Sequence, residues 1–266
     1  GCELTLSPQI IAPQLGINAS LIKDIDCSTS PNAVINATIS GGTAPFTYQL
    51  NVNGSGYGVA TSLVPAMGNT LSYSTNIAGT IKIKITDAIG CTVESQIFNV
   101  TAPAVLFGSA NAIQATCGLN NGVVTLVASS GTPSYTYSFD GSPFTTNTVY
   151  TGLSVGLHTY TIKDSKFCVY NGTINVTTPA PLGGSAILST PYNCISTGCI
   201  TVTATGGSPG YSYNIGSGFQ SSNVFCGLTN GTYNITIKDA NGCTFSVNPI
   251  TIDPLNPPTG LTFSNT

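Results

Sequence analysis

Seven of the nine cysteines recur along the chain at regular intervals, and this recurrence is the strongest constraint on the fold. Cys2, Cys91, Cys168 and Cys243 follow one another at intervals of 75 to 89 residues. A further cysteine, at position 27, 117 or 194, stands 25 or 26 residues after each of the first three. Recurrence at a nearly fixed spacing indicates tandem copies of one structural unit.

Two motifs that accompany the cysteines support the repeat. An aspartate stands four residues before Cys91, Cys168 and Cys243, at the end of a strand-like segment. A Gly- and Pro-containing motif with aromatic residues lies at 41–48, 131–137 and 206–213, and a Pro-containing join closes each copy. The sequence therefore predicts three whole repeats, at 14–102, 103–180 and 181–254. Residues 1–13 are expected to be the last strand of a preceding repeat, and residues 255–266 the first strand of a following one.

The pattern within each copy is that of β-strands. Short segments such as 123–128 and 159–162 alternate apolar and polar residues, and Gly, Pro, Asn and Asp separate them. No stretch of a dozen residues combines helical periodicity with a helix-forming composition. The expected fold class is all-β, with tandem immunoglobulin-like β-sandwich domains of about six strands each. The short joins favour an extended rod, in which each domain is about 20–35 Å long.

Two segments of the third copy resemble a known repeat. Residues 206–213 read Gly-Gly-Ser-Pro-Gly-Tyr-Ser-Tyr, and residues 231–243 end in Lys-Asp-Ala-Asn-Gly-Cys. Both resemble the SprB-type repeat, which occurs in tandem in large surface adhesins of Bacteroidota, including gliding-motility adhesins. The third repeat matches best, whereas the first departs most, with Phe46 in place of the first Tyr.

The resemblance implies a function outside the cell. It predicts a non-enzymatic segment of an extracellular adhesin or surface filament, exported by type IX secretion and used for attachment or gliding. The implied partners are extracellular surfaces or polysaccharide, neighbouring repeats of the same chain, and the secretion and surface-anchoring machinery.

The charge balance and the length of the apolar runs argue against two other classes of protein. Charged residues make up 6% of the chain, with six Lys, no Arg and a formal net charge of −3. A nucleic-acid-binding protein needs clustered basic residues, so no nucleic acid is expected as a partner. The apolar runs are well short of the roughly 20 residues of a membrane-spanning helix, so no membrane insertion is expected.

Candidate catalytic and metal-binding residues are scarce. His158 is the only His, and we expect it to be a surface or packed residue rather than a catalytic base. The recurring Asp87, Asp164 and Asp239 have too few acidic neighbours for Ca²⁺ and are expected to shape turns. Phe167 stands where the other copies have Gly, so the turn of the second repeat is expected to differ. We predict no catalytic residue, no cofactor and no metal.

An insertion in the first repeat is a candidate ligand loop. It lies at about 51–80 and contains Asn53, Ser55 and Tyr57. A longer hairpin is the alternative that we favour. Exposed aromatic residues such as Tyr57, Tyr150 or Tyr170 raise a second functional hypothesis, a carbohydrate-binding module array of a secreted enzyme.

Disulfides are the expected state of the cysteines in a secreted chain. If six strands alternate in direction, the two recurring cysteines of one repeat lie at the same end of the sandwich; with seven strands they lie at opposite ends. The six-strand arrangement predicts three bonds within repeats, Cys27–Cys91, Cys117–Cys168 and Cys194–Cys243. Cys199–Cys226 follows by elimination, and Cys2 is expected to be unpaired. The rival scheme bonds cysteines across a junction, for example Cys91 to Cys117.

Overall fold

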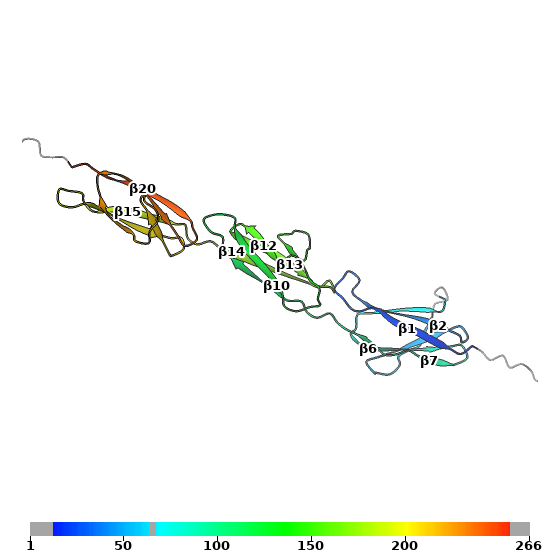
Figure 1. Cartoon of the computed structure of the whole chain (residues 1–266). Coiled ribbons are helices and arrows are strands. Elements are labelled where there is room, and N and C mark those ends of the chain that lie inside the picture. Colours follow the sequence, from blue (N-terminus) through cyan, green and yellow to red (C-terminus); the bar gives the residue numbers. More distant parts are fainter. Residues whose placement is uncertain (1–12, 64–67, 256–266) are drawn as a thin grey trace, which may run out of the picture. The chain divides into compact units, whose positions relative to one another are not determined.

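A computed structural model describes residues 13–63 and 68–255 (Figure 1). Every regular element of this part of the chain is a β-strand. No helix that is long and apolar enough to cross a membrane occurs in these ranges. The chain divides into two compact units. Unit 1 comprises Gly1–Gly108, Ala128–Tyr137 and Thr161–Asn171, and unit 2 comprises Ser109–Val127, Ser138–Tyr160 and Gly172–Thr266.

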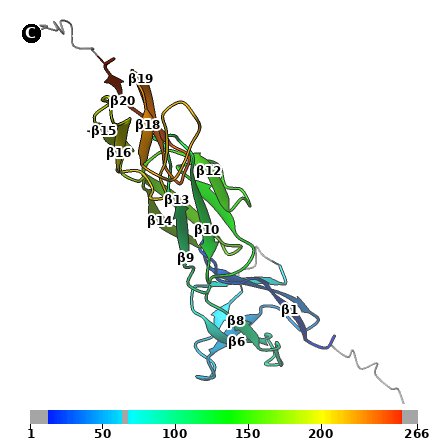
Figure 2. The same cartoon turned by 60° about the vertical axis from the view of Figure 1, so that its left-hand side comes forward.

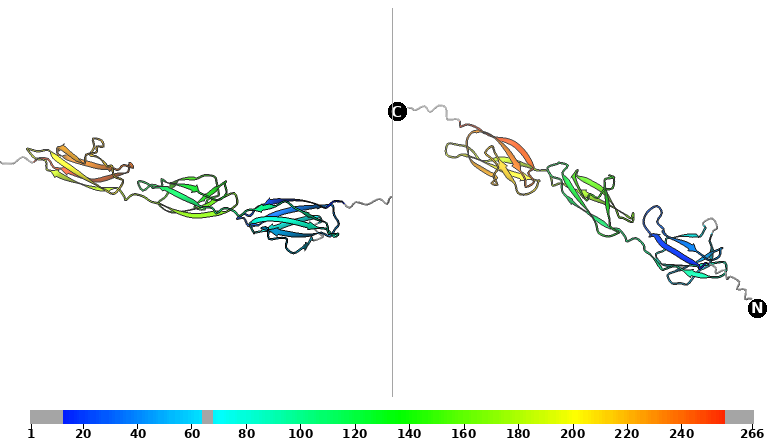
Figure 3. Two further views of the ribbon diagram at one scale, coloured as in Figure 1. Left: turned by 90° about the horizontal axis from the view of Figure 1, so that it is seen from below. Right: turned by 45° about the vertical axis from the view of Figure 1, so that its right-hand side comes forward.

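The first repeat, in unit 1, is a sandwich of two sheets. One sheet has the order β1 (Gly16–Lys23), β2 (Ala33–Ser40), β5 (Thr70–Thr75). The other has the order β4 (Thr61–Ser62), β3 (Thr47–Val52), β6 (Gly79–Thr86), β7 (Thr92–Glu94), and β8 (Phe98–Val100) also pairs with β6. Alternate residues of β2 and β6 are buried between the sheets, among them Ile35, Ile83 and Ile85. The two layers are visible in Figure 1 and in the left panel of Figure 3.

The second and third repeats each have six strands, as the sequence predicts. In the second, the sheets have the orders β12-β10-β9 and β11-β13-β14. Their bounds are β9 Gly108–Ile113, β10 Gly122–Ala128, β11 Thr136–Phe139, β12 Val149–Leu153, β13 Gly156–Lys163 and β14 Val169–Val176. In the third, the orders are β15-β16-β18 and β17-β19-β20 (Figure 2). Here the bounds are β15 Gly183–Thr190, β16 Gly198–Thr205, β17 Ser212–Asn214, β18 Val224–Leu228, β19 Gly231–Lys238 and β20 Thr244–Ile252.

The strands of the third repeat do not simply alternate in direction. β18 is antiparallel to β16, and β19 is antiparallel to β17. Short turns connect β16 to β17 and β18 to β19, so each of these connections reverses the chain. β17 and β18 therefore run the same way, and residues 215–223 between them must return along the sandwich.

This return segment is a seventh strand reduced to a single bridge. Tyr213 and Gln220 exchange two backbone hydrogen bonds, of 2.8 and 2.9 Å, in antiparallel geometry. In the first repeat the same place is held by β4, which pairs antiparallel with β3. Because of this extra reversal, the turn after the first strand and the turn before the last strand lie at opposite ends of the sandwich.

Candidate functional site: the disulfide-bonded junctions

Two of the three disulfides between described residues connect successive repeats. Cys27 of the first repeat is bonded to Cys168 of the second, with Cα atoms 4.8 Å apart, within unit 1. Cys117 of the second repeat is bonded to Cys243 of the third, with Cα atoms 5.1 Å apart, within unit 2. The third bond, Cys199–Cys226, connects β16 to β18 within one sheet.

The predicted bonds Cys27–Cys91, Cys117–Cys168 and Cys194–Cys243 are therefore wrong, whereas Cys199–Cys226 is present as predicted. The opposite placement of the two turns explains the error, because a disulfide needs Cα atoms within about 7 Å. The rival scheme correctly expected bonds across junctions but chose other partners. Cys2 lies outside the described residues.

A buried aspartate positions the later cysteine of each repeat. Asp164 Oδ1 accepts the backbone N–H groups of Lys166 and Cys168, both at 2.9 Å, and its Oδ2 accepts that of Thr132 at 2.9 Å. The first two bonds shape the turn before the last strand, and the third ties that turn to the turn after β10. Asp87 and Asp239 make the same three contacts in the other repeats. The expected role of these aspartates in turns is thus confirmed.

The turn of the second repeat has the same hydrogen bonds as the others, contrary to our expectation. Phe167 N–H donates to the Asp164 carbonyl, as Gly90 and Gly242 do to Asp87 and Asp239. Phe167 adopts a φ of 63°, close to the 87° and 83° of the two glycines. The aspartate therefore holds the turn geometry even where the residue has a Cβ.

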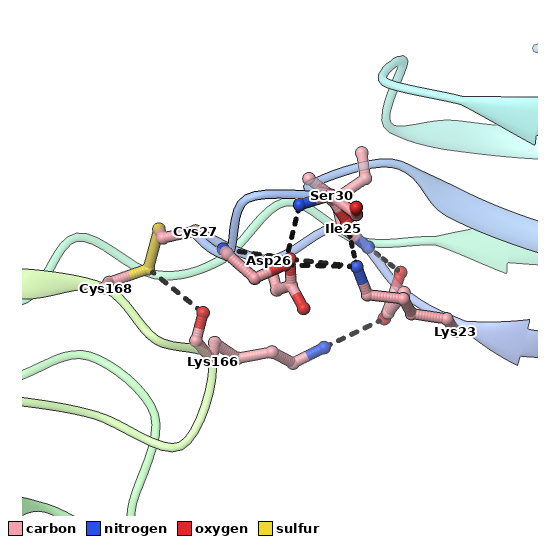
Figure 4. Close-up of polar contacts among 9 residues, drawn as sticks. Lys23, Ile25, Asp26, Cys27, Ser30, Lys166 and Cys168 are labelled. Atoms are coloured by element: carbon pink, nitrogen blue, oxygen red, sulfur yellow. Dashed lines mark hydrogen bonds and ion pairs between the residues drawn. A yellow bond between two sulfur atoms is a disulfide. The ribbon is translucent and has the colours of Figure 1, made fainter.

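Cys27 lies in a turn that is held by a second aspartate (Figure 4). Asp26 Oδ1 accepts hydrogen bonds from the backbone and hydroxyl of Ser28, at 3.1 and 2.7 Å, and from Lys23 Nζ at 3.1 Å. The ammonium of Lys23 also donates to the carbonyl of Ser30. These contacts lower the pKa of Asp26, with the Ser28 hydroxyl as the main cause.

Polar contacts accompany the Cys27–Cys168 bond (Figure 4). Cys27 N–H donates to the Lys166 carbonyl at 2.8 Å, and Lys166 Nζ lies 3.7 Å from Asp24 Oδ2. Asp24 also accepts hydrogen bonds from the backbone, at 2.7 Å, and the hydroxyl of Thr101, which belongs to the join between the repeats. Burial of Asp24 raises its pKa, but the Thr101 hydrogen bonds and the Lys166 charge outweigh it, so that the pKa is lowered. The junction thus combines one covalent bond with an ion pair whose carboxylate also accepts hydrogen bonds from the join.

The second junction, within unit 2, surrounds an open groove of about 490 Å³. The join residues 178–182 line it together with Cys117, Asp239 and Cys243. Cys117 adopts a φ of 56°, in a turn where Asn121 Oδ1 accepts the Thr116 N–H at 2.8 Å. Gly207 N–H donates to the Ala180 carbonyl at 2.7 Å, which fixes the join to the third repeat.

The candidate ligand loop has contacts that explain its shape. Asn53 Oδ1 accepts the Thr80 N–H at 2.8 Å, and Ser55 Oγ donates to the Val52 carbonyl at 2.7 Å. The Tyr57 ring lies under Lys84 Nζ, 4.4 Å from the ring centroid. Burial and the nearby Glu94 carboxylate raise the pKa of Tyr57 to about 12. Asn53 and Ser55 therefore stabilise a tight turn, which favours the hairpin interpretation.

The other residues considered for ligand binding or catalysis are also engaged. Tyr150 stacks on Phe139 at 4.5 Å between centroids, and Tyr170 packs edge-on against Phe107 at 6.4 Å. His158 is buried, as expected of a packed residue, with Nδ1 2.7 Å from Asp140 Oδ2 and Nε2 2.9 Å from the Ser154 carbonyl. Within residues 13–63 and 68–255, no three His, Cys, Asp or Glu side chains are grouped so that they could hold a metal ion.

Comparison with known proteins supports the repeat assignment. The model of the SprB repeat family matches residues 19–55 and 109–144, which include the turns of Cys27 and Cys117. Two segments of the chain, one in each of the first two repeats, thus match the SprB repeat. Both matches lie in the first two repeats, whereas the residues alone favour the third. No curated protein sequence matches the chain significantly.

Solved structures of tandem-domain proteins are weakly similar. Three N-terminal domains of the Highly Immunogenic Outer Capsid protein (Hoc) of bacteriophage RB49 are 12% identical over 92% of this chain and 100% of that chain, with a TM-score of 0.49. A tetra-tandem repeat from the extending region of a large adhesion protein is 14% identical over 92% and 75%, with a TM-score of 0.32. Invasin, a bacterial integrin-binding protein, is 14% identical over 90% and 60%, with a TM-score of 0.33. The fold assignment rests on the sheets of this chain.

Proposed function

We propose that this chain is a non-enzymatic segment of a repetitive extracellular adhesin or surface filament, and that it serves as a stalk with covalently connected repeats. The SprB repeats support a surface adhesin role. The disulfides between repeats carry the proposal further, because Cys27–Cys168 and Cys117–Cys243 resist separation of neighbouring repeats. Such bonds are typical of proteins outside the reducing cytosol.

The function at the cell surface would be to hold or repeat binding sites away from the cell. Many weak contacts along such an array give a high avidity without a strong individual site. Attachment and gliding, with export by type IX secretion, are the proposed setting, and extracellular surfaces or polysaccharide are the proposed partners.

The two disulfides between repeats overlap in sequence, and this matters under tension. The loops overlap because Cys117 lies between Cys27 and Cys168. A force applied at Cys27 is transmitted to Cys168 through the disulfide and bypasses the 141 residues between them. From Cys168 the force reaches Cys243 by two routes. One follows the chain forward and is shortened by the Cys199–Cys226 bond. The other follows the chain back to Cys117 and crosses the Cys117–Cys243 bond. Each route has about 50 residues, which limits extension between Cys27 and Cys243 to about 170 Å, against about 750 Å after reduction.

Single-molecule stretching from the two ends of the chain tests the stalk function. We expect the oxidised chain to show no unfolding step as long as a whole repeat, about 260 Å. After reduction, three such steps should appear. The Cys27→Ser/Cys168→Ser variant, which retains the second bond, should release only part of the length. Identical traces before and after reduction would show that these bonds do not limit extension, and would contradict the proposal.

A further inference from the structure

The six recurring cysteines that lie in described residues follow one rule of pairing. The turn after the first strand of each repeat contains a cysteine that we call the turn cysteine: Cys27, Cys117 or Cys194. The turn before the last strand contains the later cysteine: Cys91, Cys168 or Cys243. In both bonds between repeats, the turn cysteine of one repeat is bonded to the later cysteine of the next. By this rule Cys91 and Cys194 have no partner among the described repeats, and both are free and exposed.

Cys91 is held in the same way as its bonded equivalents. Its N–H donates to Asp87 Oδ1 at 2.8 Å, against 2.9 Å for Cys168 and Cys243 with their own aspartates. Asp87 Oδ2 accepts the Thr43 N–H at 3.1 Å, so the tie to the neighbouring turn is also present. The turn is thus formed in the unbonded state.

Cys194 also shares its local structure with a bonded equivalent. Asn193 Oδ1 accepts the N–H groups of Ile195 and Ser196 at 3.0 and 2.8 Å. Asp26, which likewise directly precedes its cysteine, accepts the N–H of Ser28. Ile195 is 95% exposed, and Ile89, near Cys91, is 64% exposed. Each free cysteine therefore lies in a preformed turn beside an apolar side chain that a neighbouring domain can cover.

We propose that Cys91 and Cys194 are junction cysteines that bond to further SprB-type repeats. Cys194 takes the later cysteine of a repeat on its C-terminal side, and Cys91 takes the turn cysteine of a repeat on its N-terminal side. The inference rests on the proposed stalk function and names the partner of each end. The overlapping bonds would then continue from repeat to repeat, so that no repeat in the array extends independently.

Bond formation needs a disulfide oxidant, such as oxidised glutathione. The Cys194 thiolate attacks one sulfur of the oxidant, forms a mixed disulfide and releases one glutathione thiolate. The thiolate of the partner cysteine then attacks the Cys194 sulfur and displaces the second glutathione. Two thiols lose two protons and two electrons, and the oxidant becomes two molecules of reduced glutathione.

An extended chain tests the C-terminal end. Residues 253–266 are replaced by a second copy of residues 101–180, which is fused directly after Ile252. Ile252 ends the last strand of the third repeat, as Val100 ends the last strand of the first, so the join has the natural length. The added copy carries Cys117→Ser, which leaves it one cysteine, and Val169→Ile, which gives its Cys168 peptide a distinct mass. After refolding with oxidised and reduced glutathione, free thiols are alkylated and peptides are mapped without reduction.

We expect Cys194 bonded to Cys168 of the added copy, beside unchanged Cys27–Cys168 and Cys117–Cys243 bonds. In the control, the added copy also carries Cys168→Ser, and Cys194 should be fully alkylated. Alkylated Cys194 in the extended chain, or its bond to another cysteine, overturns this inference while the internal bonds still support the stalk. Loss of the internal bonds overturns both proposals.

The mirror experiment tests Cys91. A copy of residues 103–179 with Cys168→Ser replaces residues 1–11, before the join that begins at Ala12. Here we expect Cys91 bonded to Cys117 of the added copy, which carries Val123→Ile as its mass label. Cys91 that stays alkylated, while Cys27–Cys168 forms, overturns the inference for this end.

Discussion

Three aspartates connect the sequence repeat to the position of the disulfides. Asp87, Asp164 and Asp239 are 6%, 4% and 4% exposed, and each accepts three backbone N–H groups. Backbone donors that are buried without an acceptor are costly, so one carboxylate satisfies three groups that the two turns leave unpaired. The aspartate thereby determines where the following cysteine points.

Replacement of Asp164 should reveal this role. Asp164→Ala leaves three N–H groups without their acceptor, and we expect a loss of about 2–4 kcal/mol in the free energy of unfolding. Asp164→Asn retains one carbonyl acceptor and should lose less. Chemical denaturation measures the stability, and peptide mapping after refolding measures the yield of Cys27–Cys168. An unchanged yield in the alanine variant would contradict the positioning role.

The conformation of Phe167 carries a cost that substitution can remove. A left-handed φ of 63° is strained for a residue with a Cβ, and the ring is 54% exposed, so little packing is lost with it. We expect Phe167→Gly and Phe167→Asn to raise the free energy of unfolding by about 1 kcal/mol. Phe167→Ala, which retains the Cβ, is the matched control and should give no gain. Equal stabilities for all three variants would show that φ carries no penalty here.

At the scale of elements, the turn after β11 is tied to β13 by a charged pair. Asp140 Oδ1 accepts the Thr159 N–H at 2.8 Å, and Asp140 Oδ2 lies 2.7 Å from His158 Nδ1. The hydrogen bond to Asp140 is the main cause of the raised pKa of His158. Burial raises the pKa of Asp140, but the hydrogen bonds of His158 and Thr159 lower it overall.

These shifts predict a pH window for the pair. The raised pKa of His158 stabilises the fold below the ordinary value of 6.5, and this contribution is lost as the pH rises through the folded pKa. The lowered pKa of Asp140 stabilises above 3.8, and its contribution is lost as the pH falls through the folded pKa. The pair should therefore contribute most between about pH 4 and 6.5, by no more than about 1 kcal/mol because Asp140 is partly exposed.

Unfolding measured against pH, with His158→Gln as the reference, tests this window. The difference between the two chains should be largest near pH 5 and should shrink above the folded pKa of His158. A difference that grows with pH would reverse the assigned sign.

At the scale of the whole molecule, the extended rod is still a prediction. Three domains of about 20–35 Å in line would reach on the order of 100 Å. Small-angle scattering of the oxidised chain should give a maximum dimension of that order. A radius of gyration near the 18 Å or so of a compact chain of this length would contradict the rod.

Much of the architecture could be predicted from local sequence. The spacing of Cys91, Cys168 and Cys243 marks the period, which can be counted directly along the chain. Alternation within segments such as 159–162 marks the strands, because it depends on neighbouring residues. The turn role of Asp239 was predictable for the same reason, since most of its hydrogen bonds reach residues two and four positions along. Cys199–Cys226 was predictable because both cysteines lie in the third repeat and neither belongs to the recurring set.

The partners of Cys27 and Cys117 were decided only by the tertiary structure. These partners depend on the return segment 215–223 and on the equivalent segments of the other repeats. In the third repeat this segment forms only the single bridge between Tyr213 and Gln220. It has no strand-like alternation in the sequence. That one reversal moves the two turns of each repeat to opposite ends, so that cysteines of successive repeats meet. A strand's residues specify its pairing face locally, whereas its direction relative to distant strands is set by the path of the whole chain.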